Sequence, residues 1–313
     1  MPVRTWHEEI VEAFLEEVAR SNCDNILLSS ELIETLMNRN ASQIFDFLSG
    51  AGFRVKFIFY VRNTPQLLNS QYSQLVKTYR IDVPFKEFIK DRLAKLPVKS
   101  ATSLLDVLDE KKVERLIRPY DERIRKVGVV ADFLECVGLK DFGADKTIER
   151  TNESVGPVAL EAGRRSIREI TGGAVNLGQL HATKCGKMLR ASLAEVGFRE
   201  PSYNGLSNDI AQRIQRAHQR VNDQFAQRAW GKTWADVFAA DIGGNHVSND
   251  LLDRQPTLSE LEALYEILEK LLPRIKSLAV DERFHKKEGF NRRGAEQIAT
   301  ALKTPRKKAK PPV

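Results

Sequence analysis

The stretch Val55-Lys-Phe-Ile-Phe-Tyr-Val61 is apolar at nearly every position, and it ends in Arg62. A run of this length without alternation predicts a parallel strand that is covered on both faces. Thr64 and Pro65 follow directly, and this pair is typical of a helix N-terminus, with Thr64 as the N-cap and Pro65 in the first turn. The sequence therefore predicts a buried strand, an arginine at its carboxyl end, and a helix that begins beside that arginine.

Strand-like and helix-like segments alternate along residues 1–142. We expect further strands at 25–31 and 112–120, a helix at about 31–50 and a short helix at 129–137. Alternation of this kind predicts an α/β layer with a mainly parallel sheet flanked by helices.

From about residue 155 the pattern becomes helical. The segments with helical periodicity are 157–171, 180–197, 206–229 and 258–279. We therefore expect an α/β core over 1–155, a helical C-terminal region over 156–280 and a basic, disordered tail over 281–313.

Composition limits the class of protein. Hydrophobic residues make up 42% of the chain and charged residues 29%, as is ordinary for a soluble globular protein. No stretch approaches the roughly 18 consecutive apolar residues that a membrane span needs. The three cysteines are scattered, without a disulfide framework or metal-ligand spacing. We therefore expect a cytoplasmic protein with no membrane span and no bound metal.

The net charge of +7 is concentrated at the C-terminus. Residues 283–313 hold ten Lys or Arg against two Glu, so the rest of the chain is close to neutral. An enzyme that acts on nucleic acid is expected to carry positive charge on its folded body as well. We therefore do not expect nucleic acid as a partner, and we interpret the tail as a solvated end. The composition is compatible with either a monomer or an oligomer.

Arg62 and Ser70 point to an anion site. In open parallel sheets, ligands bind beyond the carboxyl ends of the strands, and a helix N-terminus adds N–H groups and partial positive charge there. Ser70 lies off the stripe of Leu68 and Tyr72, so its hydroxyl can reach the same place. A guanidinium, a helix N-terminus and a hydroxyl together suit a phosphate-like group. The alternative is that Arg62 pairs with a nearby carboxylate and Ser70 is an ordinary surface serine.

The segment Tyr60-Val-Arg-Asn-Thr-Pro-Gln-Leu-Leu-Asn-Ser-Gln-Tyr72 resembles the 3′-phosphate-binding segment of sulfotransferases that use 3′-phosphoadenosine 5′-phosphosulfate (PAPS). In that family a strand ends in Arg-Asn, a Ser follows eight residues after the Arg, and an aromatic residue is close by. Arg62, Asn63, Ser70 and Tyr72 match this pattern. The resemblance implies a P-loop NTPase-like fold of the sulfotransferase type. It also implies that Arg62 and Ser70 bind the 3′-phosphate of PAPS, the donor substrate.

The resemblance covers about residues 25–155. Asp132-Phe-Leu-Glu-Cys-Val-Gly-Leu139 is similar to a segment near the end of the family's α/β core, and Leu27-Leu-Ser-Ser-Glu31 looks like the strand before the Arg-Asn strand. In many members the catalytic base stands at the end of that preceding strand. The resemblance therefore implies Glu31 as the base that removes the acceptor proton. The alternative is that Glu31 only begins the next helix, where the helix dipole favours an acid.

The family's glycine-containing loop, which grips the 5′-phosphosulfate, is missing ahead of residue 25. Gly231-Lys-Thr233 lacks the first glycine of a P-loop, and Gly186-Lys187 lies inside a helical stretch. We therefore expect either a truncated sulfotransferase or a non-catalytic relative that binds a nucleotide or a protein partner. A third interpretation is an interaction protein that uses the 258–272 helix and the basic tail. The acceptor, a hydroxyl or an amine, is not identified by the sequence.

Overall fold

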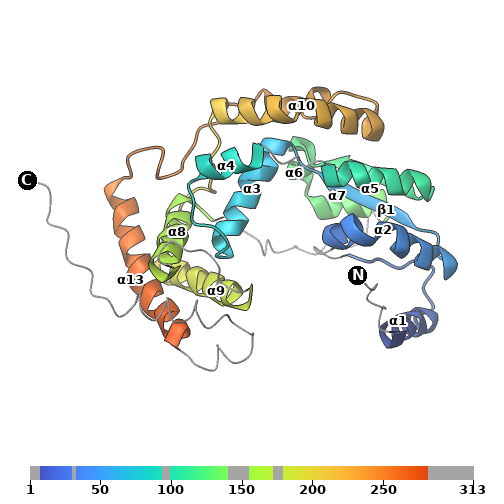
Figure 1. Cartoon of the computed structure of the whole chain (residues 1–313), viewed down its shortest axis with the longest axis horizontal. Helices are drawn as coiled ribbons and strands as arrows, with labels where there is room; N and C mark the ends of the chain where they lie inside the picture. Colours follow the sequence, from blue (N-terminus) through green and yellow to red (C-terminus); the bar gives the residue numbers. More distant parts are fainter. Residues whose placement is uncertain (1–7, 30–32, 94–98, 140–154, 172–178, 281–313) are drawn as a thin grey trace, which may run out of the picture. The chain divides into compact units, whose positions relative to one another are not determined.

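A computed structural model of the chain describes residues 8–29, 33–93, 99–139, 155–171 and 179–280 (Figure 1). The described residues fall into two compact units, one within Met1–Phe57 and Ser100–Glu114 and the other within Ile58–Lys99 and Arg115–Val313. Helices dominate, and the described residues form one small sheet of two parallel strands. The α/β class is confirmed at this coarse level. The expected boundaries at 155 and 280 stay a prediction.

The first unit contains α1 (Glu8–Ser21), α2 (Ile33–Gly50) and most of α5 (Lys99–Glu110). Phe45 of α2 is buried, and its ring meets that of Phe57 edge-on with the centroids 6.1 Å apart. The expected helix at about 31–50 is thus confirmed over the residues that the structure describes.

The expected strand at 25–31 is wrong where the structure describes it. Residues 25–29 have no regular secondary structure, and the side chains of Ile26, Leu27 and Leu28 are 41%, 65% and 54% exposed. An apolar run forms a strand only where other elements pair with it and cover it. The exposure of these side chains shows that no described element covers this run. Residues 30 and 31 lie outside the described ranges.

The second unit holds most of the sheet, whose strands are β1 (Lys56–Val61) and β2 (Glu114–Pro119). Its helices are α3 (Thr64–Lys77), α4 (Phe85–Leu93), α6 (Glu122–Val127), α7 (Val129–Cys136), α8 (Pro157–Thr171), α9 (Gln179–Val196), α10 (Asn208–Trp230), α11 (Trp234–Val237), α12 (Ala239–Ile242) and α13 (Leu258–Val280). The expected strands at 55–61 and 112–120 are confirmed as strands, and so are the helices expected at 129–137 and in the four later segments. The expected burial of β1 on both faces is wrong, because Val61 is buried, residues 57–60 are only half-buried and Lys56 is exposed.

Helix α13 packs against α8 and α9 in the lower left of Figure 1. Its side chains Leu264, Ile267 and Leu271 are fully buried in a core shared with those two helices. The helix begins with a capping box, in which the Thr257 amide donates to Glu260 at 2.8 Å and the Glu260 amide donates to Thr257 Oγ1 at 3.2 Å. Most of the apolar face of this helix is therefore part of the unit's own core, while Leu258 in its first turn is 72% exposed. The interpretation of this helix as a partner-binding face stays a prediction.

Helix α3 lies in a second core of the same unit. Leu68 and Tyr72 are fully buried, and the Tyr72 ring lies 5.1 Å from that of Phe85 and 5.6 Å from that of Tyr203, centroid to centroid. Such aromatic contacts add to the free energy gained from burial alone. The packing fixes α3 and thereby the position of the residues that connect it to β1.

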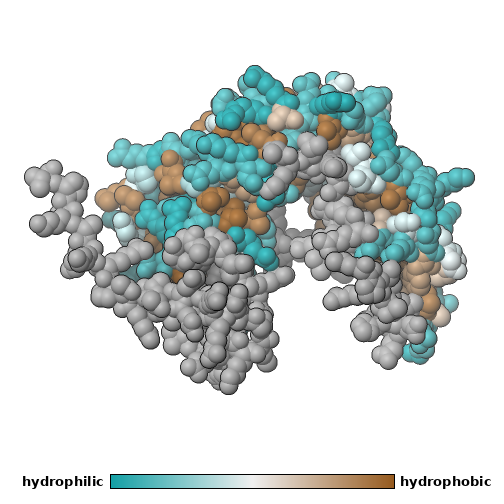
Figure 2. All heavy atoms as spheres, viewed as in Figure 1, coloured by the Kyte–Doolittle hydropathy of each residue, from teal (hydrophilic) through white to brown (hydrophobic). Residues whose placement is uncertain are grey.

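Helix α10 is amphipathic. Ile210, Ile214 and Phe225 are buried, while Arg213 and Arg216 are exposed. Figure 2 shows a mainly hydrophilic surface over this helix, at the top of the view. In the described parts of the chain, every helix is too short or too polar to cross a lipid bilayer.

The two Gly-Lys segments have structural roles, as expected. Gly231 ends α10 in the left-handed conformation at φ 67°, which favours glycine, and Thr233 then caps α11. Gly186 of α9 lies against α3, where an added Cβ would stand 2.6 Å from the Lys77 carbonyl oxygen. The first glycine serves a helix end and the second a close helix–helix approach.

Candidate anion site at the carboxyl end of the sheet

The two parallel strands bring Arg62 and Tyr120 together. Each residue lies just past the end of its strand, and the Tyr120 amide donates to the Val61 carbonyl oxygen at 2.7 Å. The Arg62 guanidinium lies over the Tyr120 ring, with Cζ 4.6 Å from the ring centroid. Both residues are half-buried, so the Arg62–Tyr120 pair is partly exposed to solvent.

Two neighbouring arginines are held by a buried carboxylate. Asp132 of α7 is fully buried and accepts from Arg118 Nε at 3.0 Å, from Arg123 Nη2 at 2.7 Å and from the Tyr60 hydroxyl at 2.9 Å. Burial alone would raise the pKa of Asp132, but these hydrogen bonds and the positive charge of Arg118 outweigh it and hold the pKa well below its usual value. This one carboxylate offsets one of the two positive charges and takes up hydrogen-bonding groups of both arginines.

A third arginine, Arg125, is paired with buried Asp241, to which its Nη1 donates at 3.3 Å and its Nη2 donates as well. Arg62 differs from these three. Within the described ranges its guanidinium has no carboxylate partner, and its contact is the ring of Tyr120. The alternative in which Arg62 pairs with a nearby carboxylate is thus not found among the described residues.

Ser70 is exposed on α3, on the side away from the buried stripe of Leu68, Tyr72 and Val76. Its hydroxyl has no hydrogen-bond partner among the described residues, and it is free to bind a ligand. No hydrogen bond joins Ser70 to Arg62 in the structure. Their joint role in binding a phosphate stays a prediction.

The beginning of α3 is covered by the chain itself. Asn63, not Thr64, is the N-cap residue, and both side chains are fully buried. The Trp234 indole donates to Asn63 Oδ1 at 2.9 Å, and Asn222 Nδ2 donates to Thr64 Oγ1 at 3.0 Å. Side chains of α10 and α11 therefore pack against the beginning of α3, and the role of its N–H groups in binding an anion stays a prediction.

Two tryptophans fix the two strands at this end of the sheet. The Trp230 indole donates to the Ile117 carbonyl oxygen of β2 at 2.8 Å, while Trp234 bonds to Asn63 beyond β1. The two indole rings lie 6.1 Å apart, and both contact the ring of Phe238. The helical region is thus bonded to β2 and to the residue that follows Arg62 after β1.

The sequence placed a different aromatic residue at the site. Tyr72 is in the core, where its hydroxyl donates to the Val83 carbonyl oxygen at 2.9 Å and accepts from Arg164 at 2.7 Å. Tyr120 is the aromatic partner of Arg62, and its place directly after the second parallel strand is the signal that would have found it. Glu31 lies outside the described residues.

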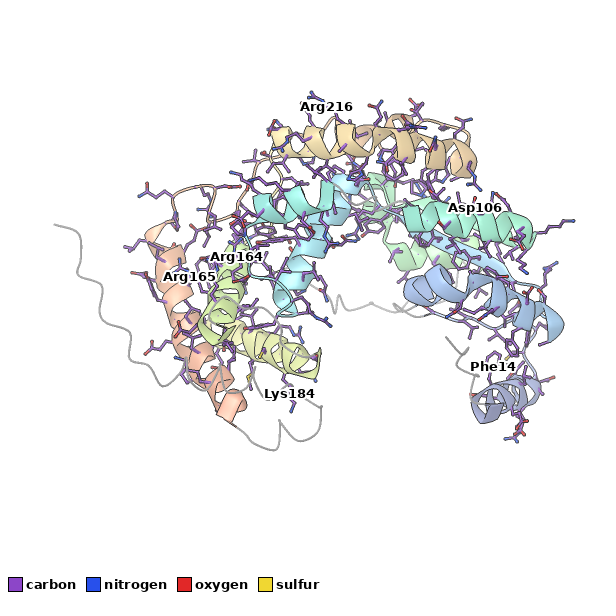
Figure 3. The ribbon with its side chains drawn as sticks, viewed as in Figure 1. Phe14, Asp106, Arg164, Arg165, Lys184 and Arg216 are labelled. Carbon is purple, nitrogen blue, oxygen red and sulfur yellow. The ribbon has the colours of Figure 1, made fainter. Side chains whose placement is uncertain are left out.

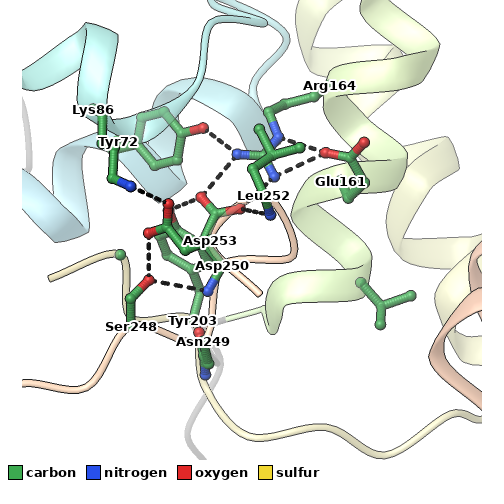
Figure 4. Close-up of polar contacts among 12 residues, drawn as sticks. Tyr72, Lys86, Glu161, Arg164, Tyr203, Ser248, Asn249, Asp250, Leu252 and Asp253 are labelled. Atoms are coloured by element: carbon green, nitrogen blue, oxygen red, sulfur yellow. Dashed lines mark hydrogen bonds and ion pairs between the residues drawn. The ribbon is translucent and has the colours of Figure 1, made fainter. Parts of the chain in front are cut away.

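A second polar region surrounds Arg164, which is fully buried (Figure 4). Arg164 donates to Asp250 at 2.8 Å and to Glu161 at 2.8 Å, and the Tyr203 hydroxyl donates to Asp250 at 2.6 Å. Burial alone would raise the pKa of Asp250, but the hydrogen bonds from Arg164 and Tyr203 hold it below its usual value. Because the charged groups here already have partners, we interpret this region as structural.

An open hollow of about 340 Å³ lies beside that region, between α4 and the 250–253 segment. Lys86 Nζ lies 2.7 Å from Asp253 Oδ1 and Asp250 is bound to Arg164, whereas Glu87 and Lys90, which also line the hollow, have no ion-pair partner among the described residues. The described residues contain no group of three or more His, Cys, Asp or Glu that could hold a metal ion. We take Arg62 as the stronger candidate for binding a ligand because it lies beyond the carboxyl end of a parallel strand, where ligands bind in sheets of this kind.

Comparisons with models of known protein families, with curated proteins and with solved structures found no match for this chain. The function is therefore inferred from the geometry around Arg62 and from the resemblance of residues 60–72 to the sulfotransferase segment.

Proposed function

We propose that the protein binds the 3′-phosphate of a 3′-phosphoadenosine nucleotide at Arg62, and that it is a sulfotransferase-like protein. One observation carries this proposal. Arg62 stands at the carboxyl end of a parallel strand, stacked on Tyr120, with no carboxylate partner among the described residues. Arginine binds phosphate by two parallel N–H bonds, and stacking leaves the edge of the guanidinium available for them.

The three neighbouring arginines support the same conclusion by contrast. Arg118, Arg123 and Arg125 each bind a buried aspartate, which satisfies part of their hydrogen-bonding capacity. A phosphate at any of them would have to compete with a carboxylate that is already in place. At Arg62 a phosphate meets no such competitor, so the full charge-assisted interaction is available.

The finer features of the proposal come from the sequence resemblance. They are a P-loop NTPase-like fold of the sulfotransferase type, PAPS as the donor, and Ser70 as a second ligand of the 3′-phosphate. The exposed, unpaired hydroxyl of Ser70 is compatible with that role. The 3′-phosphate distinguishes PAPS from ATP, so these residues would select the nucleotide.

Sulfuryl transfer is the second part of the proposal. The bond between sulfur and the 5′-phosphate oxygen breaks and releases 3′-phosphoadenosine 5′-phosphate (PAP), while sulfur bonds to an acceptor oxygen or nitrogen. The acceptor proton passes to a base, which the resemblance assigns to Glu31. We expect Glu31→Gln to abolish release of PAP from PAPS while PAP still binds.

Calorimetric titration with PAP and with AMP tests the nucleotide site. We expect PAP to bind about 10- to 100-fold more tightly than AMP, as one charge-assisted phosphate interaction is worth roughly 1.5–3 kcal/mol. Arg62→Ala should remove this preference and Ser70→Ala should reduce it. The control is Arg213→Ala, which alters an exposed arginine of α10.

Equal affinity for PAP and AMP in the unaltered protein contradicts the proposal, and so does a preference for PAP that survives Arg62→Ala. Circular dichroism of each variant shows whether the fold is retained. A loss of preference in Arg213→Ala as well would mean that general positive charge, and not Arg62, attracts the nucleotide.

A further inference from the structure

We infer that Tyr120 is a positioning residue for anion binding, because its ring holds the Arg62 guanidinium in the orientation that the phosphate requires. This inference rests on the proposed function of Arg62. It adds a residue that neither the sequence resemblance nor the composition identified. The structural basis is the stacked contact, with Arg62 Cζ 4.6 Å from the centroid of the Tyr120 ring.

The Tyr120 backbone is fixed on two sides. Its amide donates to the Val61 carbonyl oxygen at 2.7 Å, which continues the pairing of β1 and β2 by one bond. Its carbonyl oxygen accepts from Arg125 Nη1 at 3.5 Å, and Arg125 is itself held by buried Asp241. The Tyr120 backbone is therefore fixed by its pairing with β1 and by its contact with the ion-paired Arg125.

The residue after Arg62 is fixed as well. Asn63 is fully buried and accepts a hydrogen bond from the Trp234 indole at 2.9 Å. The Arg62 backbone is thus set between a strand residue and a buried cap, and its half-buried side chain contacts the Tyr120 ring. Ordering an arginine side chain costs up to roughly 2 kcal/mol of conformational entropy.

The ring lowers that cost before the ligand arrives. The Arg62 guanidinium lies over the Tyr120 ring, with Cζ 4.6 Å from the centroid, so the ring contacts one side of it and leaves N–H groups for a phosphate. Preorganisation of this kind raises affinity without any contact between Tyr120 and the ligand. The interaction needs an aromatic face but not the Tyr120 hydroxyl, so phenylalanine should replace tyrosine here.

A double-mutant cycle tests the inference with PAP as the probe. We expect Tyr120→Leu to weaken PAP binding by about 3- to 30-fold, in line with the range of cation–π energies. Tyr120→Phe should bind PAP nearly as the unaltered protein does. In an Arg62→Ala background, Tyr120→Leu should have no further effect, because Tyr120 acts through Arg62. Tyr265→Leu alters an exposed tyrosine of α13 and serves as the control.

The outcomes separate this inference from the proposed function. If PAP binding depends on Arg62 but is unchanged in Tyr120→Leu, the inference is wrong and the proposed function stands. If Tyr120→Leu weakens binding equally with and without Arg62, Tyr120 touches the nucleotide itself and the inference is again wrong. If the unaltered protein binds no PAP, both are wrong.

Nuclear magnetic resonance of the Arg62 Nε–H group tests the inference without a ligand. The order parameter of this group should fall in Tyr120→Leu and be retained in Tyr120→Phe.

Discussion

Arg164 and Arg62 combine the same residue types in opposite ways. Arg164 is fully buried, contacts Tyr72, and has two carboxylates, Glu161 and Asp250, within hydrogen-bonding distance. Arg62 is half-buried, contacts Tyr120, and has no carboxylate partner among the described residues. In the first case the tyrosine hydroxyl accepts a hydrogen bond, and in the second the ring face carries the contact.

The comparison shows which features indicate that an arginine stabilises the fold and which indicate that it binds a ligand. A buried guanidinium must have its charge and its N–H groups satisfied within the protein, and removing one partner leaves an uncompensated buried charge. A half-buried guanidinium without a carboxylate keeps unused hydrogen-bonding capacity at little cost, because water serves it until a ligand arrives. Variants at the two sites should therefore differ in kind as well as in size.

The largest expected effect is at the buried site. Arg164→Leu should lower the free energy of unfolding by about 3–5 kcal/mol, because Asp250 stays buried without its counter-charge and Glu161 keeps only Arg165. Arg165→Leu is the matched control, since Arg165 is the neighbouring residue of α8, with a partly exposed side chain that pairs with Glu161 at 2.7 Å (Figure 3). It should cost less than about 1 kcal/mol. Urea denaturation followed by circular dichroism measures the free energy of unfolding of both variants. Equal losses would contradict the idea that the buried arginine contributes more to stability than the exposed one.

An intermediate effect on stability is expected at Asp132, which binds both Arg118 and Arg123 near the end of the sheet. Asp132→Asn should lower the free energy of unfolding by about 2–3 kcal/mol at pH 7, because the hydrogen bonds from Arg118 and Tyr60 lose their charged acceptor. Glu135→Gln, on an exposed position of the same helix, should change it by less than about 0.5 kcal/mol.

The effect of Asp132→Asn should depend on pH. The pKa of Asp132 is lower in the folded protein than in the unfolded chain, so the carboxylate stabilises the fold fully above the unfolded value of about 3.9. That stabilisation is lost as the pH falls below this value. The difference between the variant and the unaltered protein should thus be constant from pH 7 to 5 and shrink towards pH 2. A difference that grows on acidification would show that Asp132 does not titrate as the contacts require.

The smallest effect on stability is expected at Arg62. Arg62→Ala should lower the free energy of unfolding by less than about 1 kcal/mol, since a single partly exposed cation–π contact is lost. The same variant should give the largest loss of PAP affinity. Urea denaturation of the free protein measures the first quantity. A loss as large as that of Arg164→Leu would mean that Arg62 serves the fold and that its free hydrogen-bonding edge is incidental.

The sequence predicted the elements whose local signals agree with their packing. The 55–61 strand is apolar at nearly every position, α3 has Pro65 in its first turn, and α13 has the periodicity expected at 258–279. All three elements formed, although β1 is only half-buried. The run at 25–29 carries the same apolar signal but is exposed, because strand formation depends on a neighbour that the local sequence does not contain.

The sequence predicted those parts of the candidate site that depend on local signals, and it missed those that depend on distant residues. The position of Arg62 follows from the strand and the helix that flank it, and so it was predicted locally. The contact with Tyr120 joins residues 58 positions apart in the sequence, and the burial of Asn63 depends on Trp234 from the helical region. Long-range contacts of this kind depend on packing and leave no local pattern.

The indole bonds of Trp230 and Trp234 have a spectroscopic consequence. The chain contains three tryptophans, and these two report on the same place, the docking of the helical region onto the strand ends. Their emission should respond to local detachment at that junction, even while the α8–α13 core remains intact. Fluorescence and far-ultraviolet dichroism recorded in parallel would therefore reveal whether the strand ends open before the helices melt.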